Sequence, residues 1–281
     1  MASTHFLSWC YRTSSNTTNI SNLRVTELEE MPIPLPSLPE QRRIAAMLEE
    51  ADRLRRARRY ALELSDTVLP AAFLEMFGDP SSSSFKFPKR ALVELCTQIT
   101  DGTHITPTYL SEGVPFLSVK NVNTASGELD FADVRFISNE AHAILCKACR
   151  PERGDILYTK VGATFGIPKL VDVDHKFSIF VSLALLKPDS STIDPLYLAR
   201  VLGLDYVLSQ ARRLVSGIAV PDLHLREIRT FMIPVPPLPL QQRFADLVRG
   251  HEQLRAAQRE SLRQAEHLFQ SLLMKVFGEG L

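Results

Sequence analysis

The sequence lacks any long apolar run. No stretch approaches the roughly 18–20 residues that a membrane-spanning helix needs, and charge or proline breaks every candidate. The N-terminus also lacks the basic-then-apolar layout of a secretory signal. We therefore expect a cytoplasmic protein without membrane contact. The 281 residues, 45% of them hydrophobic, suffice for one large domain or two smaller ones.

An excess of positive charge is missing as well. The 32 Lys and Arg residues balance 32 Asp and Glu residues, so the formal net charge is zero. Proteins that bind DNA are usually basic, because Lys and Arg contact the phosphates. If this chain binds nucleic acid, it gathers its basic groups on one face or gains electrostatic attraction from a partner.

Cysteine is scarce. The four residues are Cys10, Cys96, Cys146 and Cys149, and His142 precedes the Cys146-x-x-Cys149 pair. A zinc site of the usual kind needs a second ligand pair, which the sequence does not contain. Disulfides are not expected in a cytosolic chain of this size. We interpret the cysteines as ordinary thiols, with zinc as the weaker alternative, and predict no metal site.

Motifs for catalysis are also absent. There is no G-x-x-x-x-G-K-[ST] phosphate loop and no Asp/Asn-Pro-Pro-aromatic motif of an amino-methyltransferase. The glycines of residues 162–166 lack a following Lys-Ser/Thr, which predicts a turn between strands. Two groups of side chains could be considered for catalysis, namely Asp101 with His104, and Ser178 or Ser182 with His175. Their spacing in the sequence does not support a catalytic triad. We predict no catalytic residue and no cofactor.

One stretch of the sequence occurs twice, 200 residues apart. Residues 33–79 align without a gap to residues 233–279, with 15 identities in 47 positions. Each copy begins with alternating prolines, through which a helix cannot propagate, and continues with Leu-Pro-x-x-Gln-x-Arg. We interpret this as an internal duplication. The identities are Ile33, Pro34, Pro36, Leu38, Pro39, Gln41, Arg43, Ala45, Leu54, Arg55, Ala57, Arg59, Leu62, Phe77 and Gly78.

Each copy predicts a long helix with an apolar seam. Apolar residues recur at alternating spacings of three and four, which is typical of a coiled coil, and Arg, Glu and Gln dominate the positions between. In the second copy His251, Gln258 and Ser261 interrupt the seam. Pro70 should kink or end the first helix early. Two such helices would pair antiparallel. The alternative is a helix pair that serves stability alone.

Residues 80–232 have a different composition. After a polar linker come short apolar runs bounded by Gly, Pro, Asn and Asp, among them residues 114–119, 155–159 and 179–186. These runs predict the strands of a mainly β or α+β domain. A helix is expected from Pro195 to about Leu214.

The loops of this block contain residue types that suit DNA binding. Lys and Arg neutralise phosphates or donate to guanine, Asn pairs with adenine, and Ser or Thr hydrogen-bonds to either class of base. An enzyme pocket has similar loops, so composition alone is a weak signal. We expect Lys160→Ala to weaken binding across sequences. The candidate DNA-binding residues are Thr103, His104, Lys120, Asn121, Thr159, Lys160, Arg212 and Arg213.

The doubled motif resembles specificity subunits of type I restriction–modification systems. In that family a proline-rich approach and Leu-Pro-x-x-Gln-x-Arg open the helix after each target-recognition domain. The order of Asp101-Gly102-Thr103-His104, Gly154-Asp155-Ile156-Leu157 and Val220-Pro221-Asp222-Leu223 also resembles the family.

The resemblance implies an α+β fold in which one mainly β recognition domain is flanked by two long helices forming an antiparallel coiled coil. It implies a non-catalytic subunit that binds double-stranded DNA and docks methyltransferase and restriction subunits. The expected domains are a remnant of a first recognition domain (1–32), a spacer helix (33–79), a recognition domain (80–232) and a second spacer helix (233–281).

This sequence departs from the family pattern at its beginning, because only the tail of a first recognition domain aligns. The chain is therefore expected to be N-terminally truncated. It is either a relic that binds poorly or a half-subunit, which a second specificity chain would complete. Two further hypotheses stay open. One is an interaction scaffold without working DNA recognition, and the other is a small hydrolase or transferase that uses loops near His104 and Asp155.

Overall fold

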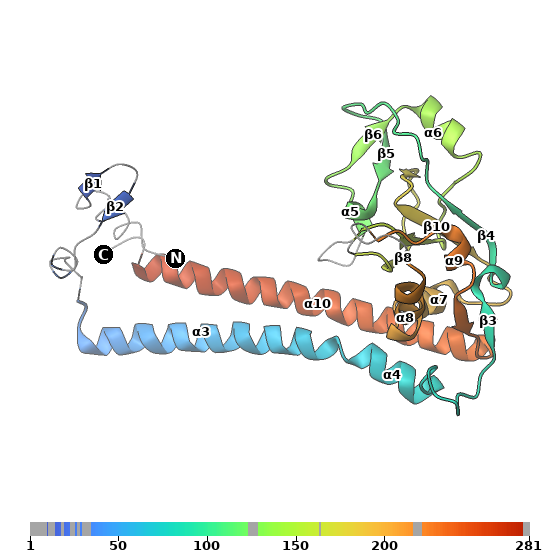
Figure 1. Ribbon diagram of the computed structural model, residues 1–281. Helices are drawn as coiled ribbons and strands as arrows, with labels where there is room; N and C mark the ends of the chain where they lie inside the picture. Colours follow the sequence, from blue (N-terminus) through green and yellow to red (C-terminus); the bar gives the residue numbers. More distant parts are fainter. Residues whose placement is uncertain are drawn as a thin grey trace. The chain divides into compact units, whose positions relative to one another are not determined.

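The computed structural model describes residues 10, 15–17, 20–22, 26, 29, 35–122, 129–162, 164–215 and 221–277 (Figure 1). The chain divides into two units. We call Met1–Val68 with His251–Leu281 the helix-pair unit, and Leu69–Gly250 the central unit. Most of the expected 1–32 remnant lies outside the described residues.

Helices and strands are mixed along the described chain. The helices are α3 (Leu38–Ser65), α4 (Val68–Phe77), α5 (Val119–Val122), α6 (Asn139–Leu145), α7 (Pro195–Leu202), α8 (Asp205–Leu214), α9 (Leu225–Ile228) and α10 (Leu238–Phe277), with a 3-10 turn η1 at Leu92–Glu94. The strands are β1 (Ser15–Thr17), β2 (Ile20–Asn22), β3 (Lys89–Ala91), β4 (Cys96–Asp101), β5 (Val114–Leu117), β6 (Arg135–Ile137), β7 (Ile156–Thr159), β8 (Pro168–Leu170), β9 (Ser178–Ile179), β10 (Leu183–Pro188) and β11 (Met232–Pro234).

In the helix-pair unit, α3 lies antiparallel beside the C-terminal part of α10 (Figure 1). Arg59 Nη2 contacts Glu266 Oε1 at 2.8 Å, and the Arg55 guanidinium lies 4.2 Å from the centroid of the Phe269 ring. Contacts therefore move backward along α10 as they move forward along α3. The predicted antiparallel coiled coil and the α+β fold class are confirmed.

The first helix breaks where the sequence predicts. Pro70 has no N–H to donate to the carbonyl of Asp66, so α3 ends at Ser65 and α4 begins at Val68. The break removes a helical partner from the Ser65 carbonyl as well. His251 Nε2 lies 2.8 Å from this carbonyl, so the imidazole that interrupts the apolar seam donates a hydrogen bond there.

The described residues of the central unit form three small sheets. An antiparallel sheet has the order β4-β10-β7-β8, and β3 pairs antiparallel with β11. The third sheet has the order β6-β5-β9, in which β5 and β9 are parallel. The largest apolar cluster packs α7 and the start of α10 against the first of these sheets.

Two predicted elements are each divided in the structure. The apolar run 179–186 forms the end of β9 and most of β10, because the chain turns between Phe180 and Leu183. The helix expected from Pro195 to Leu214 ends at Leu202 and restarts at Asp205. Gly203 lies at the break, where its low helix propensity favours a stop.

Candidate nucleic-acid interface

Residues 180–182 connect three of the predicted site loops. Thr103 forms an isolated β-bridge with Phe180. The Lys160 N–H donates to the Ser182 carbonyl (3.0 Å), and the Val119 N–H donates to Ser182 Oγ (3.2 Å). The loops after β4, β5 and β7 therefore meet at this segment.

A glycine permits the closest of these approaches. A Cβ atom at Gly102 would overlap the carbonyl of Ile179. Only glycine avoids that overlap without a backbone shift, and Thr103 then reaches its bridge with Phe180.

Lys160 forms a buried ion pair. Its Nζ lies 2.9 Å from Asp101 Oδ2, and both side chains are largely shielded from solvent. His104 Nε2 lies 3.4 Å from the same carboxylate oxygen. The Lys160 ammonium is therefore already neutralised inside the protein and is not presented to a phosphate.

Asn121 and Thr159 are also buried, and their polar atoms are bonded within the protein. Asn121 Oδ1 accepts from the Ser118 N–H (3.0 Å), and Asn121 Nδ2 donates to the Asp133 carbonyl (2.9 Å). Thr159 Oγ1 donates to the Thr164 carbonyl (2.8 Å). With Lys160, these two residues position the loops, and their burial speaks against the predicted direct contact with DNA.

The other predicted residues are more accessible. His104 and Lys120 are exposed, and Lys120 Nζ contacts Asp133 at 3.2 Å. Thr103 is half-buried and donates through Oγ1 to the carbonyl of Ile105 (3.0 Å).

Arg212 and Arg213 are exposed in the last turn of α8. Arg212 Nη1 lies 4.0 Å from Asp205 on the same helix. The described hydrogen bonds connect the loops of Thr103, Lys120 and Lys160, whereas these two arginines belong to a different element.

A groove of about 390 Å³ opens beside these loops. Its lining combines aromatic rings, hydroxyl groups and two cations, from the segments around β5, β6 and β10. The lining residues are Tyr109, Phe116, Ser118, Val119, Lys120, Arg135, Phe180 and Ser182.

Of the groove residues, sequence reasoning selected only Lys120. Arg135 reaches the groove because β6 pairs with β5, which sets Arg135 opposite Phe116. Its guanidinium lies 4.4 Å from the centroid of the Tyr109 ring. The alternation of Val134, Arg135 and Phe136 was the available signal for a strand with a cation on one face.

Comparisons with known proteins identify the architecture. Residues 4–64 match the family model described as Type I restriction modification DNA specificity domain. Three solved structures match 99% of this chain. The HsdS subunit from Thermoanaerobacter tengcongensis has a TM-score of 0.55 and 23% identity over 70% of its length. The S subunit of a type I restriction–modification system from M. genitalium has a TM-score of 0.55 and 18% identity over 73% of its length.

The third match is a chain from a structure of complex assembly and conformational transition of the type I R-M system. It has a TM-score of 0.64 and 22% identity, and this chain covers 69% of it. The chain has the fold of a type I specificity subunit. The resemblance seen in the doubled motif is thereby confirmed. The comparison with curated proteins found no match.

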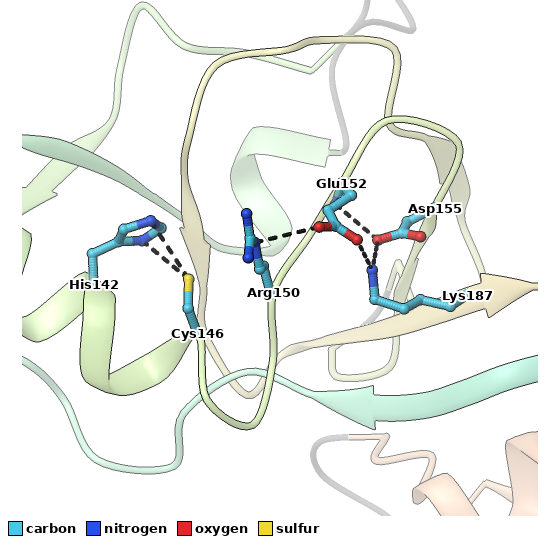
Figure 2. Close-up of polar contacts among 6 residues, drawn as sticks. All are labelled: His142, Cys146, Arg150, Glu152, Asp155 and Lys187. Carbon is cyan, nitrogen blue, oxygen red and sulfur yellow. Dashed lines mark hydrogen bonds and ion pairs between the residues drawn. The ribbon is translucent and has the colours of Figure 1, made fainter.

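Within this specificity-subunit fold, the titratable groups near Asp155 form a structural ion cluster (Figure 2). Lys187 Nζ contacts Asp155 Oδ2 (2.6 Å) and Glu152 Oε2 (3.0 Å), which links the start of β7 to β10. Burial raises the pKa of Asp155, although Lys187 opposes this shift. Asp155 and His104 engage different partners, so the structure gives the hydrolase or transferase hypothesis no support.

His142 lies between a serine and a cysteine. His142 Nδ1 is 2.8 Å from Ser178 Oγ. Cys146 Sγ is 3.5 Å from His142 Nε2, a contact that Figure 2 shows. Burial raises the pKa of Cys146 and lowers that of His142. The pair is therefore a neutral thiol beside a neutral imidazole, not an activated thiolate. His175, which the sequence paired with serine, instead packs 4.1 Å from the Phe131 ring.

Among the described residues, no three His, Cys, Asp or Glu side chains gather as a metal cage. In the same part of the chain, no helix combines the length and apolar character needed to cross a bilayer.

Proposed function

We propose that this chain is a specificity subunit that binds double-stranded DNA at a defined sequence. It directs the methyltransferase and restriction subunits of a type I system to that site and catalyses no reaction itself. The specificity-subunit fold along 99% of the chain carries this proposal. Residues 80–232 act as the target-recognition domain, 33–79 and 233–281 as spacer helices, and 1–32 as the tail of a first recognition domain, in the cytoplasm.

Exposed cations of the central unit support DNA binding. Lys120, Arg135, Arg212 and Arg213 present charges to solvent. Because the whole chain has no net charge, attraction to DNA comes from these local groups and from partner subunits. The exposed imidazole of His104 supplies a polar group for base edges.

Lys120→Ala is expected to weaken duplex binding for all sequences, because a phosphate contact carries no sequence information. The slope of log affinity against log salt should fall by about 1, the release of roughly one counterion. Fluorescence anisotropy on a mixed-sequence duplex over a salt series measures both. The Lys120–Asp133 pair is exposed, so its loss should barely change stability.

Lys86→Ala is the matched control, since Lys86 is an exposed lysine outside the groove. An unchanged salt slope in Lys120→Ala, or an equal change in the control, would remove Lys120 from the phosphate contacts.

The helix-pair unit supports docking of partner subunits. Several of its apolar side chains remain exposed although α3 and α10 pack together. Exposed apolar side chains are typical of protein-binding surfaces where they gather. We assign these side chains to the docking of the methyltransferase subunits. The exposed residues are Leu54, Tyr60, Leu64, Leu254, Leu268 and Met274.

The same exposed side chains favour the scaffold function as a second candidate. A scaffold would form the complex with methyltransferase subunits and show no preference in a binding-site selection. Selection with the chain and its methyltransferase subunit, followed by sequencing of the bound DNA, separates the two functions.

The internal duplication also supports a second specificity chain. In the second copy, Gln241 Nε2 donates to the Pro236 carbonyl (2.7 Å), and Gln241 Oε1 accepts from the Asp194 N–H (2.8 Å). In the first copy, Gln41 Nε2 makes the corresponding bond to the Pro36 carbonyl (2.8 Å). Within the described residues, Gln41 Oε1 has no donor.

Corresponding apolar residues of the two copies also differ, because those of the second copy are more buried. Phe244 and Ala245 are buried in the central unit, whereas the corresponding Ile44 is half-buried and Ala45 is exposed. Leu38 is 64% exposed. We infer that the start of α3 receives a recognition domain from a second copy of this chain, as the start of α10 receives its own.

The wild-type chain is therefore expected to sediment as a dimer, with twice its mass of 31.5 kDa. Leu38→Glu should shift it to monomer, because a carboxylate would be buried in the new contact. Analytical ultracentrifugation measures both states. Leu268→Glu, an exposed leucine elsewhere on the helix pair, should leave the dimer intact. A monomer at all concentrations, or a dimer that tolerates Leu38→Glu, contradicts the inference.

A further inference from the structure

The groove of the central unit combines aromatic, hydroxyl and cationic side chains. Its volume of about 390 Å³ lies within the range of small-ligand sites, roughly 300–1,000 Å³. Tyr109, Phe116 and Phe180 supply aromatic walls, and Lys120 and Arg135 supply cations.

The aromatic rings of the groove pack against one another, and Phe180 stays partly accessible. The centroids of Phe116 and Phe180 are 6.1 Å apart with an interplanar angle of 62°, so the two rings do not stack face to face. Phe116 is buried and fixed, whereas Phe180 is half-buried and borders the groove. Arg135 stacks on Tyr109, and a guanidinium plane is itself a stacking surface for a base.

Hydroxyl groups give the groove a polar side. Ser182 is nine-tenths buried, and its Oγ accepts the Val119 N–H, which leaves the hydroxyl proton to donate. Ser118 Oγ donates to Asn121 Oδ1 (3.3 Å) and keeps lone pairs to accept. A donor and an acceptor therefore stand beside the aromatic walls, as recognition of the polar edge of a base requires.

The charges at the groove match an anionic guest. Lys120 is exposed, and among the described residues it pairs with Asp133, whose own side chain is more exposed still. Such an exposed pair is weak and exchanges readily for a phosphate. Asn121 accepts a hydrogen bond from the Ser118 N–H and donates one to the Asp133 carbonyl. These two bonds fix the segment of Ser118 relative to the segment of Asp133 beside the groove.

We propose that this groove binds one unstacked nucleobase of a DNA strand, with the base against Phe180 and the adjoining phosphate on Lys120. This proposal rests on the proposed DNA-binding function and extends it from the paired duplex to a base outside the stack. Because stacking tolerates any base, the aromatic walls supply affinity, and the hydroxyl groups of Ser118 and Ser182 discriminate among the bases. The buried Asn121 and Lys160 act as positioning residues for this groove.

The test compares two short duplexes that differ only in one extrahelical 2-aminopurine, using the full-length chain at low salt. The duplex with the extrahelical base should bind about tenfold more tightly, the contribution of one stacked base. Its fluorescence should also be quenched by contact with an aromatic ring. Anisotropy of a terminal dye gives both affinities.

Two variants at Phe180 distinguish the contribution of ring stacking to binding of the extrahelical base from that of an apolar side chain of similar size. Phe180→Leu should abolish the tenfold preference, so that the duplex with the extrahelical base and the paired duplex bind this variant with equal affinity. Phe180→Tyr, which keeps the ring, should retain the preference. Equal circular dichroism spectra and melting temperatures establish that both variants are folded.

The outcomes distinguish this proposal from the one it rests on. Equal, salt-dependent binding of both duplexes overturns the groove assignment and leaves DNA binding intact. A preference that survives Phe180→Leu also overturns the assignment. Binding of neither duplex overturns both proposals. If free deoxyadenosine monophosphate displaces the extrahelical duplex with an affinity equal to that of the duplex, the site takes a mononucleotide and the assignment to a DNA strand fails.

Discussion

Replacing Gln241 by leucine is expected to lower the free energy of unfolding of the central unit by about 3 kcal/mol. Gln241 is fully buried, and its amide joins three backbone groups. It accepts from the Asp194 N–H (2.8 Å) and donates to the carbonyls of Pro236 (2.7 Å) and Thr192 (3.4 Å). Leucine leaves these groups without a partner, and each buried unsatisfied group costs about 1–3 kcal/mol. Urea unfolding followed by circular dichroism measures the loss.

The duplication provides the matched control. Gln41 makes only the bond to Pro36 among the described residues and is half-buried. Gln41→Leu should therefore cost under about 1 kcal/mol at protein concentrations below self-association. It should weaken dimerisation instead, because the start of α3 is the proposed docking site. Equal destabilisation by the two substitutions would contradict the difference between the two copies.

Lys160→Met is expected to destabilise the chain by about 3–5 kcal/mol, because it leaves the Asp101 carboxylate largely buried without its partner. His104 is exposed and 3.4 Å away, too weak a substitute. Asp101→Asn in the Lys160→Met background should recover part of the loss, since it removes the unpaired charge. Urea unfolding of the two single variants and the double variant measures the coupling.

This expectation replaces the phosphate-contact role that the sequence suggested for Lys160. A stability loss under about 1 kcal/mol, together with a flatter salt dependence of DNA binding, would restore the original interpretation.

The long helices were predictable because their signals are local or repeated. The seam spacing and the doubled Leu-Pro-x-x-Gln-x-Arg motif identify both helices, and Pro70 gives the break after Ser65. His251 was visible only as an exception in the seam. Its hydrogen bond to Ser65 depends on the antiparallel pairing of residues far apart in the chain, which spacing alone does not fix.

The site was less predictable, because polar loop residues look alike in a sequence. Asn121 and Lys120 are adjacent, yet one is buried within the loop and the other is exposed at the groove. Tyr109 and Arg135 join the groove through strand pairing and a ring contact between separate segments. The turn that separates β9 from β10 likewise depends on partners from other loops, so the run of apolar residues predicted one strand.

The repeated glutamine contact has a consequence for how such chains diversify. Both helix starts use the same residue type bonded to the carbonyl five positions earlier. A genetic crossover between two related genes within the repeated stretch would exchange the segment between the two copies. Each long helix would still begin with the same glutamine contact. New DNA specificities can thus arise without any change at the starts of the two long helices.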